Sequence, residues 1–189
     1  MKTRIIILFA VLAASIGALR AQDDDGYDGL YLGSPTEISV SYGGLPAMRW
    51  MKVYADHWQN INPWGVVAVS IDHRFATRFW AGMSYTLSSG SSGRASEGRQ
   101  GSVTWHSLMM HGRLVYGWSG RWQFYGEAGV GVIISYLQPS WAPTYNRTHF
   151  AFQAAPVGVQ LRVLDNFDIF AEAGFGVQGI LRGGLRLDL

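Results

Sequence analysis

The stretch "AEAGFGVQGILRGGLRLDL", from Ala171 to Leu189, decides the fold. Its second half alternates strictly, so that in an extended strand Leu185 and Leu187 point to one side. Arg186 and Asp188 then point to the other side. In a soluble protein the leucine side needs a core to cover it, whereas in a membrane barrel it faces lipid. The rest of the sequence must distinguish these two cases.

Period-two alternation, the main sequence signal for β-strands, recurs along the chain. The expected strands are Thr36–Gly43, Val66–Arg74, Thr77–Leu87, Val103–Tyr116, Arg121–Leu137, His149–Val163, Phe167–Gly176 and Gln178–Leu189. All but the first reach the roughly 9–11 residues that a tilted transmembrane strand needs. An even number of antiparallel strands is typical of bacterial outer-membrane barrels.

The N-terminus has the layout of a secretory signal peptide. Lys2 and Arg4 precede an apolar run over residues 5–14, and small residues follow up to Ala21. We expect cleavage after Ala21. The alternative, an uncleaved membrane anchor, is disfavoured because the apolar run ends by Leu19, short of the roughly 20 residues that a spanning helix needs.

We therefore divide the chain into a signal peptide (residues 1–21), a flexible acidic periplasmic lead (22–35) and a barrel domain (36–189). The whole chain has 15 basic and 13 acidic residues, and the signal removes three basic ones, which leaves 12 against 13. No basic stripe remains that would indicate a nucleic-acid partner. The absence of cysteine excludes a disulfide scaffold and a lipid-modified cysteine.

Two features favour lipid, rather than a soluble core, for the apolar side of the strands. Aromatic residues gather near strand ends on that side, as interfacial girdles do; we place Phe79, Tyr116, Trp122 and Phe167 at one level and Tyr85, Trp105 and Tyr136 at the other. Tight connections also alternate with longer ones, which fall at residues 44–65, 88–102 and 138–148. Short periplasmic turns and long outer loops are typical of such barrels. The alternative is a soluble, lipocalin-like ligand-binding barrel.

Several blocks, among them "NPWGVVAVSIDHRFATRFWAGMSYTLSSG" and "FDIFAEAGFGVQGILRGGLRLDL", resemble the small outer-membrane β-barrel proteins of Bacteroidota. The resemblance covers nearly all of the chain after residue 21. It implies an eight-stranded barrel of the OmpA/OmpX type, a porin-like fold whose members are mostly without an assigned biochemical function. The expected fold class is thus all-β, an eight-stranded antiparallel up-and-down transmembrane barrel in a Gram-negative outer membrane, with both termini in the periplasm.

Charged residues on the polar side of the strands should meet inside such a barrel. They are Arg113, Glu127, Arg162, Asp168, Glu172, Arg182 and Arg186. The interior of an eight-stranded barrel is just wide enough for side chains to fill it. We interpret these residues as a structural ion-pair network, since unpaired buried charges are costly. The alternative is a narrow pore or proton relay.

A lipid A-modifying hydrolase is a further alternative, because the chain contains "TWHSLMMHG". His106 and Ser107 are adjacent in a strand, so they point to opposite sides. Ser107 and His111 share a side but are about 13 Å apart along the strand. We expect no catalysis, and the scattered histidines predict neither a metal site nor a cofactor.

The first long connection, "GLPAMRWMKVYADHWQNINPWG", has apolar residues at helical spacing, with Pro46 suited to a first turn. We expect a short amphipathic helix at the outer rim that plugs the barrel, lies in the lipid interface or binds a partner. The candidate interaction residues are Met48, Trp50, Met51, Tyr54 and Trp58. The partners we expect are outer-membrane lipid and an unidentified protein at the outer loops, and we expect a monomer with a structural or surface-interaction role.

Overall fold

The computed structural model describes residues 35–56, 61–94, 99–140 and 142–189. The expected signal peptide, nearly all of the lead and Trp58 lie outside the described residues. The elements are β1 (Thr36–Gly44), η1 (Ala47–Arg49), η2 (Lys52–Ala55), β2 (Ile61–Pro63), β3 (Val66–Ala76), β4 (Phe79–Arg94), β5 (Arg99–Ser119), β6 (Trp122–Pro139), β7 (Tyr145–Leu164), β8 (Phe167–Gly176) and β9 (Leu181–Asp188). Among the described residues, no helix is long and apolar enough to span a membrane.

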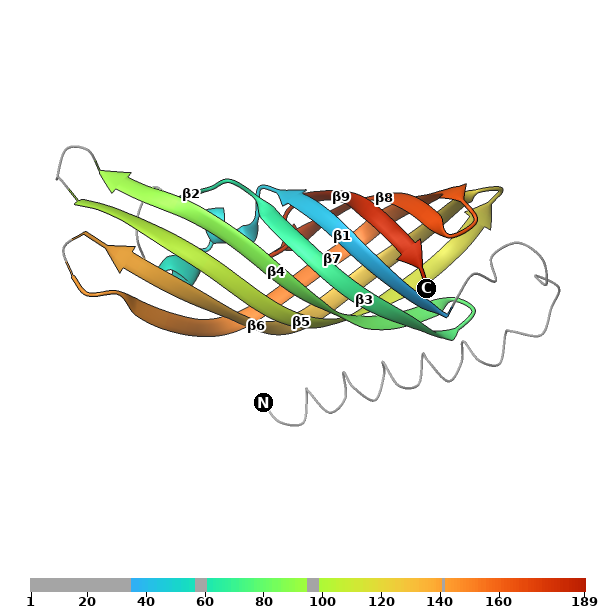
Figure 1. Ribbon diagram of the computed structural model, residues 1–189, viewed down its shortest axis with the longest axis horizontal. Coiled ribbons are helices and arrows are strands. Elements are labelled where there is room, and N and C mark those ends of the chain that lie inside the picture. Colours follow the sequence, from blue (N-terminus) through green and yellow to red (C-terminus); the bar gives the residue numbers. More distant parts are fainter. Residues whose placement is uncertain (1–34, 57–60, 95–98, 141) are drawn as a thin grey trace.

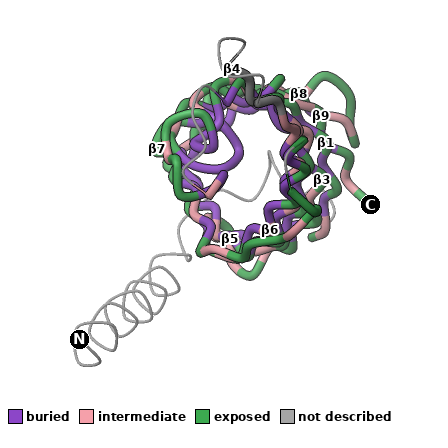
Figure 2. The backbone as a smooth tube through the Cα atoms, turned by 90° about the vertical axis from the view of Figure 1, so that its left-hand side faces the viewer, coloured by how far each residue is buried: buried purple, intermediate pink, exposed green. Residues whose placement is uncertain are grey.

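Eight of the strands form a closed antiparallel barrel in which chain neighbours are also sheet neighbours, and β9 returns to pair with β1 (Figure 2). The pairing register shows the tilt of the strands. Followed from Ser41 through β3, β4, β5 and β6, it reaches His149 on β7. Followed the other way, through β9 and β8, it reaches Gln160 on the same strand. This stagger is what closure of a tilted sheet requires. The predicted eight-stranded fold is confirmed.

Alternation along each strand separates an apolar outer wall from a polar interior. On β9, the side chain of Leu185 is 50% exposed and that of Arg186 is 2% exposed. The same contrast holds on β1, where the exposed Val40 lies between the buried Ser39 and Ser41. The leucines of the C-terminal strand therefore lie on the outer wall, and the arginines point into the barrel, as the sequence predicts.

The connections at the two ends of the barrel differ in length (Figure 1). At one end, two-residue gaps at 77–78, 120–121 and 165–166 join successive strands. At the other end, β4 to β7 extend beyond β1 and β9, and β2 adds three residues to the edge of β4. The prediction of a loop over residues 88–102 is wrong, because most of this segment is strand. The sequence of this segment is polar and glycine-rich, so it lacks the apolar alternation that predicts a strand.

Two other expectations need correction. Trp105, assigned to the outer aromatic girdle, is buried inside the barrel. It lies two positions before Ser107 on the same strand, so both side chains point to the inner side. The helix expected in the first connection is two short 3₁₀-helices, η1 and η2, rather than one amphipathic helix. The chain turns between and after them, and Asp56 ends η2 in the left-handed conformation with φ 49°.

A charge on the outer wall tests whether this wall contacts lipid. Leu185 on β9 pairs with Val40 on β1 and with Ile169 on β8. Both of these residues are apolar and face outward. We expect Leu185→Arg to lower the free energy of unfolding in bilayers by about 2–4 kcal/mol, the cost of a cation near the bilayer midplane. Chemical unfolding in lipid vesicles measures it. Leu185→Val is the control, and an equal effect of both variants would contradict a lipid-facing wall.

Candidate functional site in the barrel interior

A central ion network joins three strands inside the barrel. The carboxylate of Glu172 on β8 accepts hydrogen bonds from Arg182 Nε at 2.8 Å and from Arg186 Nη2 at 3.2 Å, both on β9. Arg182 Nη2 also donates to Glu127 Oε1 on β6 at 2.8 Å. All four side chains are buried. Each carboxylate thus faces at least one guanidinium, which compensates the cost of burying either charge alone.

A second group of charges lies toward the end with the short turns. Arg113 on β5 donates to Glu37 on β1 at 2.5 Å. Arg162 on β7 pairs with Asp168 at 3.1 Å and with Asp188 at 2.9 Å. The seven charged residues expected inside the barrel therefore lie there in these two groups. Sequence reasoning did not include Glu37, although its parity on β1 places it on the inner side.

The guanidinium groups of Arg113 and Arg186 each lie between two aromatic rings. Arg113 lies 4.6 Å from the ring centroid of Trp80 and 5.5 Å from that of Tyr125. Arg186 lies 4.8 Å from the ring of Tyr125 and 4.1 Å from that of Phe170. The result is an aromatic–arginine stack, Trp80–Arg113–Tyr125–Arg186–Phe170, built from β4, β5, β6, β9 and β8. A desolvated cation–π contact contributes about 2 kcal/mol or more.

Tyr125 joins the stack to the ion network. Its hydroxyl donates to Glu172 Oε1 at 2.7 Å and accepts from Arg186 Nη2 at 3.0 Å. Gly158 on β7 makes room for the ring, since a Cβ at that position would lie 2.5 Å from Tyr125 Cε2. A glycine is therefore required where the ring crosses the neighbouring strand.

Neutral side chains extend the network across the barrel. Gln178, in the β8–β9 connection, donates to Ser84 of β4 at 2.9 Å and accepts from Arg182. Gln160 of β7 donates to Asp168 and accepts from Arg186. These glutamines connect strands that are not neighbours in the sheet, so the interior is crossed by polar contacts and not only lined by them.

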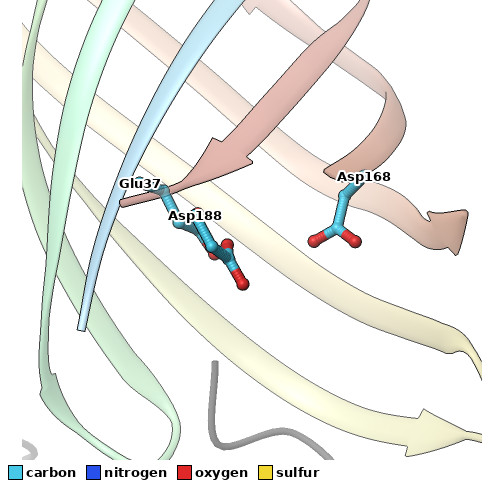
Figure 3. Close-up of side chains that lie close together, drawn as sticks. All are labelled: Glu37, Asp168 and Asp188. Atoms are coloured by element: carbon cyan, nitrogen blue, oxygen red, sulfur yellow. The ribbon is translucent and has the colours of Figure 1, made fainter. Parts of the chain in front are cut away.

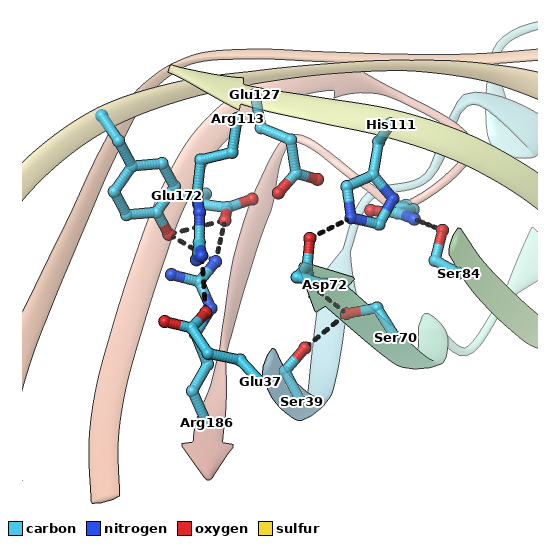
Figure 4. A network of polar contacts seen from close by, with 12 residues as sticks. Glu37, Ser39, Ser70, Asp72, Ser84, His111, Arg113, Glu127, Glu172 and Arg186 are labelled. Atoms are coloured by element: carbon cyan, nitrogen blue, oxygen red, sulfur yellow. Dashed lines mark hydrogen bonds and ion pairs between the residues drawn. The ribbon is translucent and has the colours of Figure 1, made fainter. Parts of the chain in front are cut away.

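A third polar group involves the histidine that a hydrolase would use. His111 Nε2 lies 2.7 Å from Asp72 Oδ1 of β3, and both are buried. Ser70 donates to the same carboxylate at 3.3 Å (Figure 4). Ser107 instead forms a hydrogen bond with Thr86 of β4. Ser107 and His111 thus have separate partners inside the barrel, and the two residues do not form a serine–histidine pair.

Three carboxylates come close together near the short-turn end (Figure 3). One oxygen each of Glu37, Asp168 and Asp188 lies within 4.8 Å of the others. Arg113 neutralises the first of them, and Arg162 bridges the other two. The arginines already supply the positive charge that such a cluster needs, so the geometry gives no reason to place a cation there.

The first connection fills the opposite mouth of the barrel. Met48, Tyr54 and Ala55 are buried against inward-facing residues of the wall, among them Trp105 and Ile133. This apolar group lies above the ion network and closes the mouth. Of the three roles considered for this connection, the structure thus shows the plug.

Tyr54 anchors this plug through both its main chain and its side chain. Its carbonyl accepts from Trp105 Nε1 at 2.7 Å and from Ser135 Oγ at 2.6 Å. Its hydroxyl donates to the carbonyl of Phe150 on β7 at 3.0 Å. Burial raises the pKa of the Tyr54 hydroxyl, which therefore remains a donor at any physiological pH.

The other candidate interaction residues have different surroundings. Trp50 is 55% exposed, and Met51 is partly buried against the plug. Asp56, at the end of η2, accepts from the Tyr145 hydroxyl at 2.9 Å and lies 3.6 Å from Arg147 Nε. Only part of the connection is therefore available to a partner, since its buried residues hold it in the mouth.

Comparisons with known proteins bear on the fold. No protein-family model matches the chain, and no curated protein matches it. Among solved structures the chain is similar to Neisserial surface protein A, at 10% identity and a TM-score of 0.53, over 82% of this chain and 96% of that one. It also matches the N-terminal β-barrel domain of Pseudomonas aeruginosa OprF, at 13% identity and a TM-score of 0.46, over 83% and 99%. Ail, the attachment invasion locus protein of Yersinia pestis, matches at 13% identity and a TM-score of 0.43, over 80% and 93%. At these identities the likeness concerns the fold alone.

Removing the charge of Glu172 tests how much the ion network contributes to the stability of the barrel. In Glu172→Gln, Arg182 keeps Glu127 but Arg186 loses its carboxylate partner. We expect the free energy of unfolding to fall by about 3 kcal/mol, because an uncompensated charge is left buried. Urea unfolding followed by tryptophan fluorescence measures it. Asp165→Asn, in an exposed turn, is the control and should change stability by less than about 0.5 kcal/mol. Equal stability of the two variants would contradict this role.

The plug can be tested at its anchor. Tyr54→Ala removes the ring and its hydrogen bond to Phe150, and we expect amide hydrogen exchange over residues 47–56 to rise at least tenfold. Tyr54→Phe, which loses only the hydroxyl, should raise it less, because a single hydrogen bond contributes about 1 kcal/mol. Exchange followed by mass spectrometry measures both. Unchanged protection in Tyr54→Ala would show that the plug is held by other contacts.

Proposed function

We propose that this chain is an outer-membrane β-barrel protein with a closed interior, whose role is structural or lies in interactions at the cell surface. The observation that best supports this proposal is the aromatic–arginine stack. It crosses the barrel from Trp80 to Phe170, and its two guanidinium groups are paired with carboxylates. The plug closes the mouth above it. Together these layers fill the space that an ion or small solute would need.

The outer wall supports insertion into a bilayer. Large apolar side chains are about half exposed all round this wall, such as Val40 and Leu185 on the neighbouring β1 and β9, and Val130 on β6. A continuous apolar band of this kind would make a soluble barrel aggregate, whereas lipid covers it. The lipocalin-like alternative is therefore disfavoured, because it requires the apolar side chains to point inward.

We place both termini in the periplasm. The carbonyl of Pro35 accepts from the Arg74 amide, and the Asp188 amide donates to the carbonyl of Asn166. Both ends of the barrel chain thus lie beside the short turns, which are periplasmic in such barrels. The signal peptide over residues 1–21 accounts for export. An origin in Bacteroidota rests on the sequence resemblance.

The surface role is supported by the end of the barrel opposite the short turns, where β4 to β7 extend beyond the other strands. β7 pairs with β8 only from Gln153 onward. The Phe152 and Phe150 carbonyls accept from the Val177 amide and the Tyr54 hydroxyl, so in strand pairing residues 146–149 have β6 as their partner and leave an edge toward β8. The edge they form and the exposed Trp50 of the plug lie on the side that faces away from the cell in this orientation. An unidentified protein at the outer loops is the partner we propose. We propose a monomer, and we assign no catalysis, because His111 and Ser107 are used in interior contacts.

Membrane fractionation and gel migration test this proposal. We expect the protein in the outer-membrane fraction, and we expect it to migrate faster before boiling than after, because a closed barrel stays folded in detergent. In planar bilayers, both the natural protein and Glu172→Gln should show no unit conductance, since the stack remains in place in both. Stepwise currents would favour the narrow-pore alternative, and a soluble periplasmic protein would contradict the membrane assignment.

A hydrolase is tested separately, by the mass of lipid A from cells with and without the protein. An unchanged spectrum is the expected result. A loss of acyl chains that depends on the protein would contradict a non-catalytic role.

A further inference from the structure

One polar cluster lies on the apolar outer wall, and the interior network does not use it. It consists of Tyr85 on β4, His106 on β5 and Tyr136 on β6. The Tyr85 hydroxyl lies 2.5 Å from His106 Nδ1. The ring of Tyr136 meets that of His106 edge to face, with centroids 5.4 Å apart. Both tyrosines are exposed, so the cluster is open to whatever surrounds the barrel.

The cluster marks the upper boundary of the apolar band. Toward the short turns, the outward residues that precede it are apolar, namely Met83, Leu108 and Ile134. On the other side, Leu87 is the last exposed apolar residue of β4, beside His106. Beyond it the same strand parity brings Ser89, Thr104 and Gln138 to the outer wall. In the orientation proposed above, this boundary lies at the headgroups of the outer leaflet. The cluster therefore lies where phosphate groups of lipids are found.

The hydrogen bond inside the cluster determines which group is left to bind a ligand. A phenol is the better donor and an imidazole nitrogen the better acceptor, so Tyr85 donates to His106 Nδ1. The proton of the neutral imidazole then resides on Nε2. Within the described part of the chain, no hydrogen bond joins His106 Nε2 or the Tyr136 hydroxyl to another residue. Two donors thus lie at the edge of the hydrocarbon, where an unpaired donor is costly.

We propose that Tyr85, His106 and Tyr136 form a binding site for the phosphate group of an outer-leaflet lipid headgroup. Phosphate oxygens accept from His106 Nε2 and from the Tyr136 hydroxyl, and Tyr85 fixes the imidazole. Thr104 and Asn146, which flank Tyr136 in the register, add a hydroxyl and an amide beside it. The cluster itself contains no carboxylate that would repel an anion. This inference rests on the proposed membrane orientation.

The opposite rim offers a matched control. His73 on β3 also faces outward, and its Nδ1 lies 3.1 Å from Thr36 Oγ1. Its ring meets Phe75 edge to face, at 5.2 Å. It is thus an exposed outer-wall histidine at the level of the short turns, in the other leaflet. If histidine merely favours the membrane interface, replacing His73 or His106 should change lipid A retention equally. If the proposed site exists, only the replacement of His106 should weaken it.

The test uses the full barrel in nanodiscs of phosphatidylcholine, with and without diphosphoryl lipid A. Nitrogen NMR of the labelled imidazoles should show a saturable shift of His106 Nε2 with lipid A, and none of His73. We expect His106→Leu to weaken lipid A retention about tenfold, which corresponds to about 1.4 kcal/mol. Tyr136→Phe should weaken it about threefold, because only one donor is lost. His73→Leu should leave it unchanged.

The proposal fails if His106→Leu retains lipid A as the natural protein does, or if His73→Leu loses it equally. A saturable shift of His106 with inorganic phosphate in lipid-free micelles would also overturn the assignment to a lipid headgroup. Each variant is first checked for faster gel migration before boiling than after. A variant that inserts and folds but shows no lipid preference contradicts this site and leaves the proposed barrel function intact. A protein that does not insert contradicts the proposed function itself.

Discussion

The contact of Glu172 with Arg182 and Arg186 is the constraint on which the barrel interior depends. All three side chains are buried, so bulk water does not solvate their charges. Because a lone buried charge is costly, the arginines must stay within reach of this carboxylate, which fixes the register of β8 against β9. Aromatic rings add to these contacts, since the ring centroids of Tyr125 and Phe170 lie 4.8 and 4.1 Å from the Arg186 guanidinium.

This central layer also explains why the two ends of the barrel differ. Above it the large inward side chains are apolar, such as Trp105, Ile133 and Leu137, and they need an apolar partner. The first connection supplies this partner with Met48 and Tyr54, which pack inside the mouth of the barrel. Below the central layer, Arg162 and Asp188 pair close to the short turns, where a plug is not needed.

Sequence reasoning reached the fold because period-two alternation is local and the barrel follows chain order. It also placed the charged residues on the inner side. It did not identify their partners, since these depend on the stagger of the closed sheet; Arg113 meets Glu37 across 76 positions of the chain. The 3₁₀-helices were mistaken for one amphipathic helix because burial, rather than helical periodicity, selects Met48 and Tyr54. The two strands of the β4–β5 hairpin were expected, but their extension over residues 88–102 was not, because the sequence there has no apolar residues that alternate with polar ones.

The closed interior proposed above restricts where this protein can meet other molecules. Inward side chains are committed to one another, and most outward side chains within the apolar band can contact only acyl chains. A polar side chain on the outer wall can therefore act only at the band's boundary, and a polar backbone edge only beyond it. His106 and the β7 segment over residues 146–149 meet these two conditions. Under the proposed function, the residues that recognise other molecules therefore lie at the outer rim.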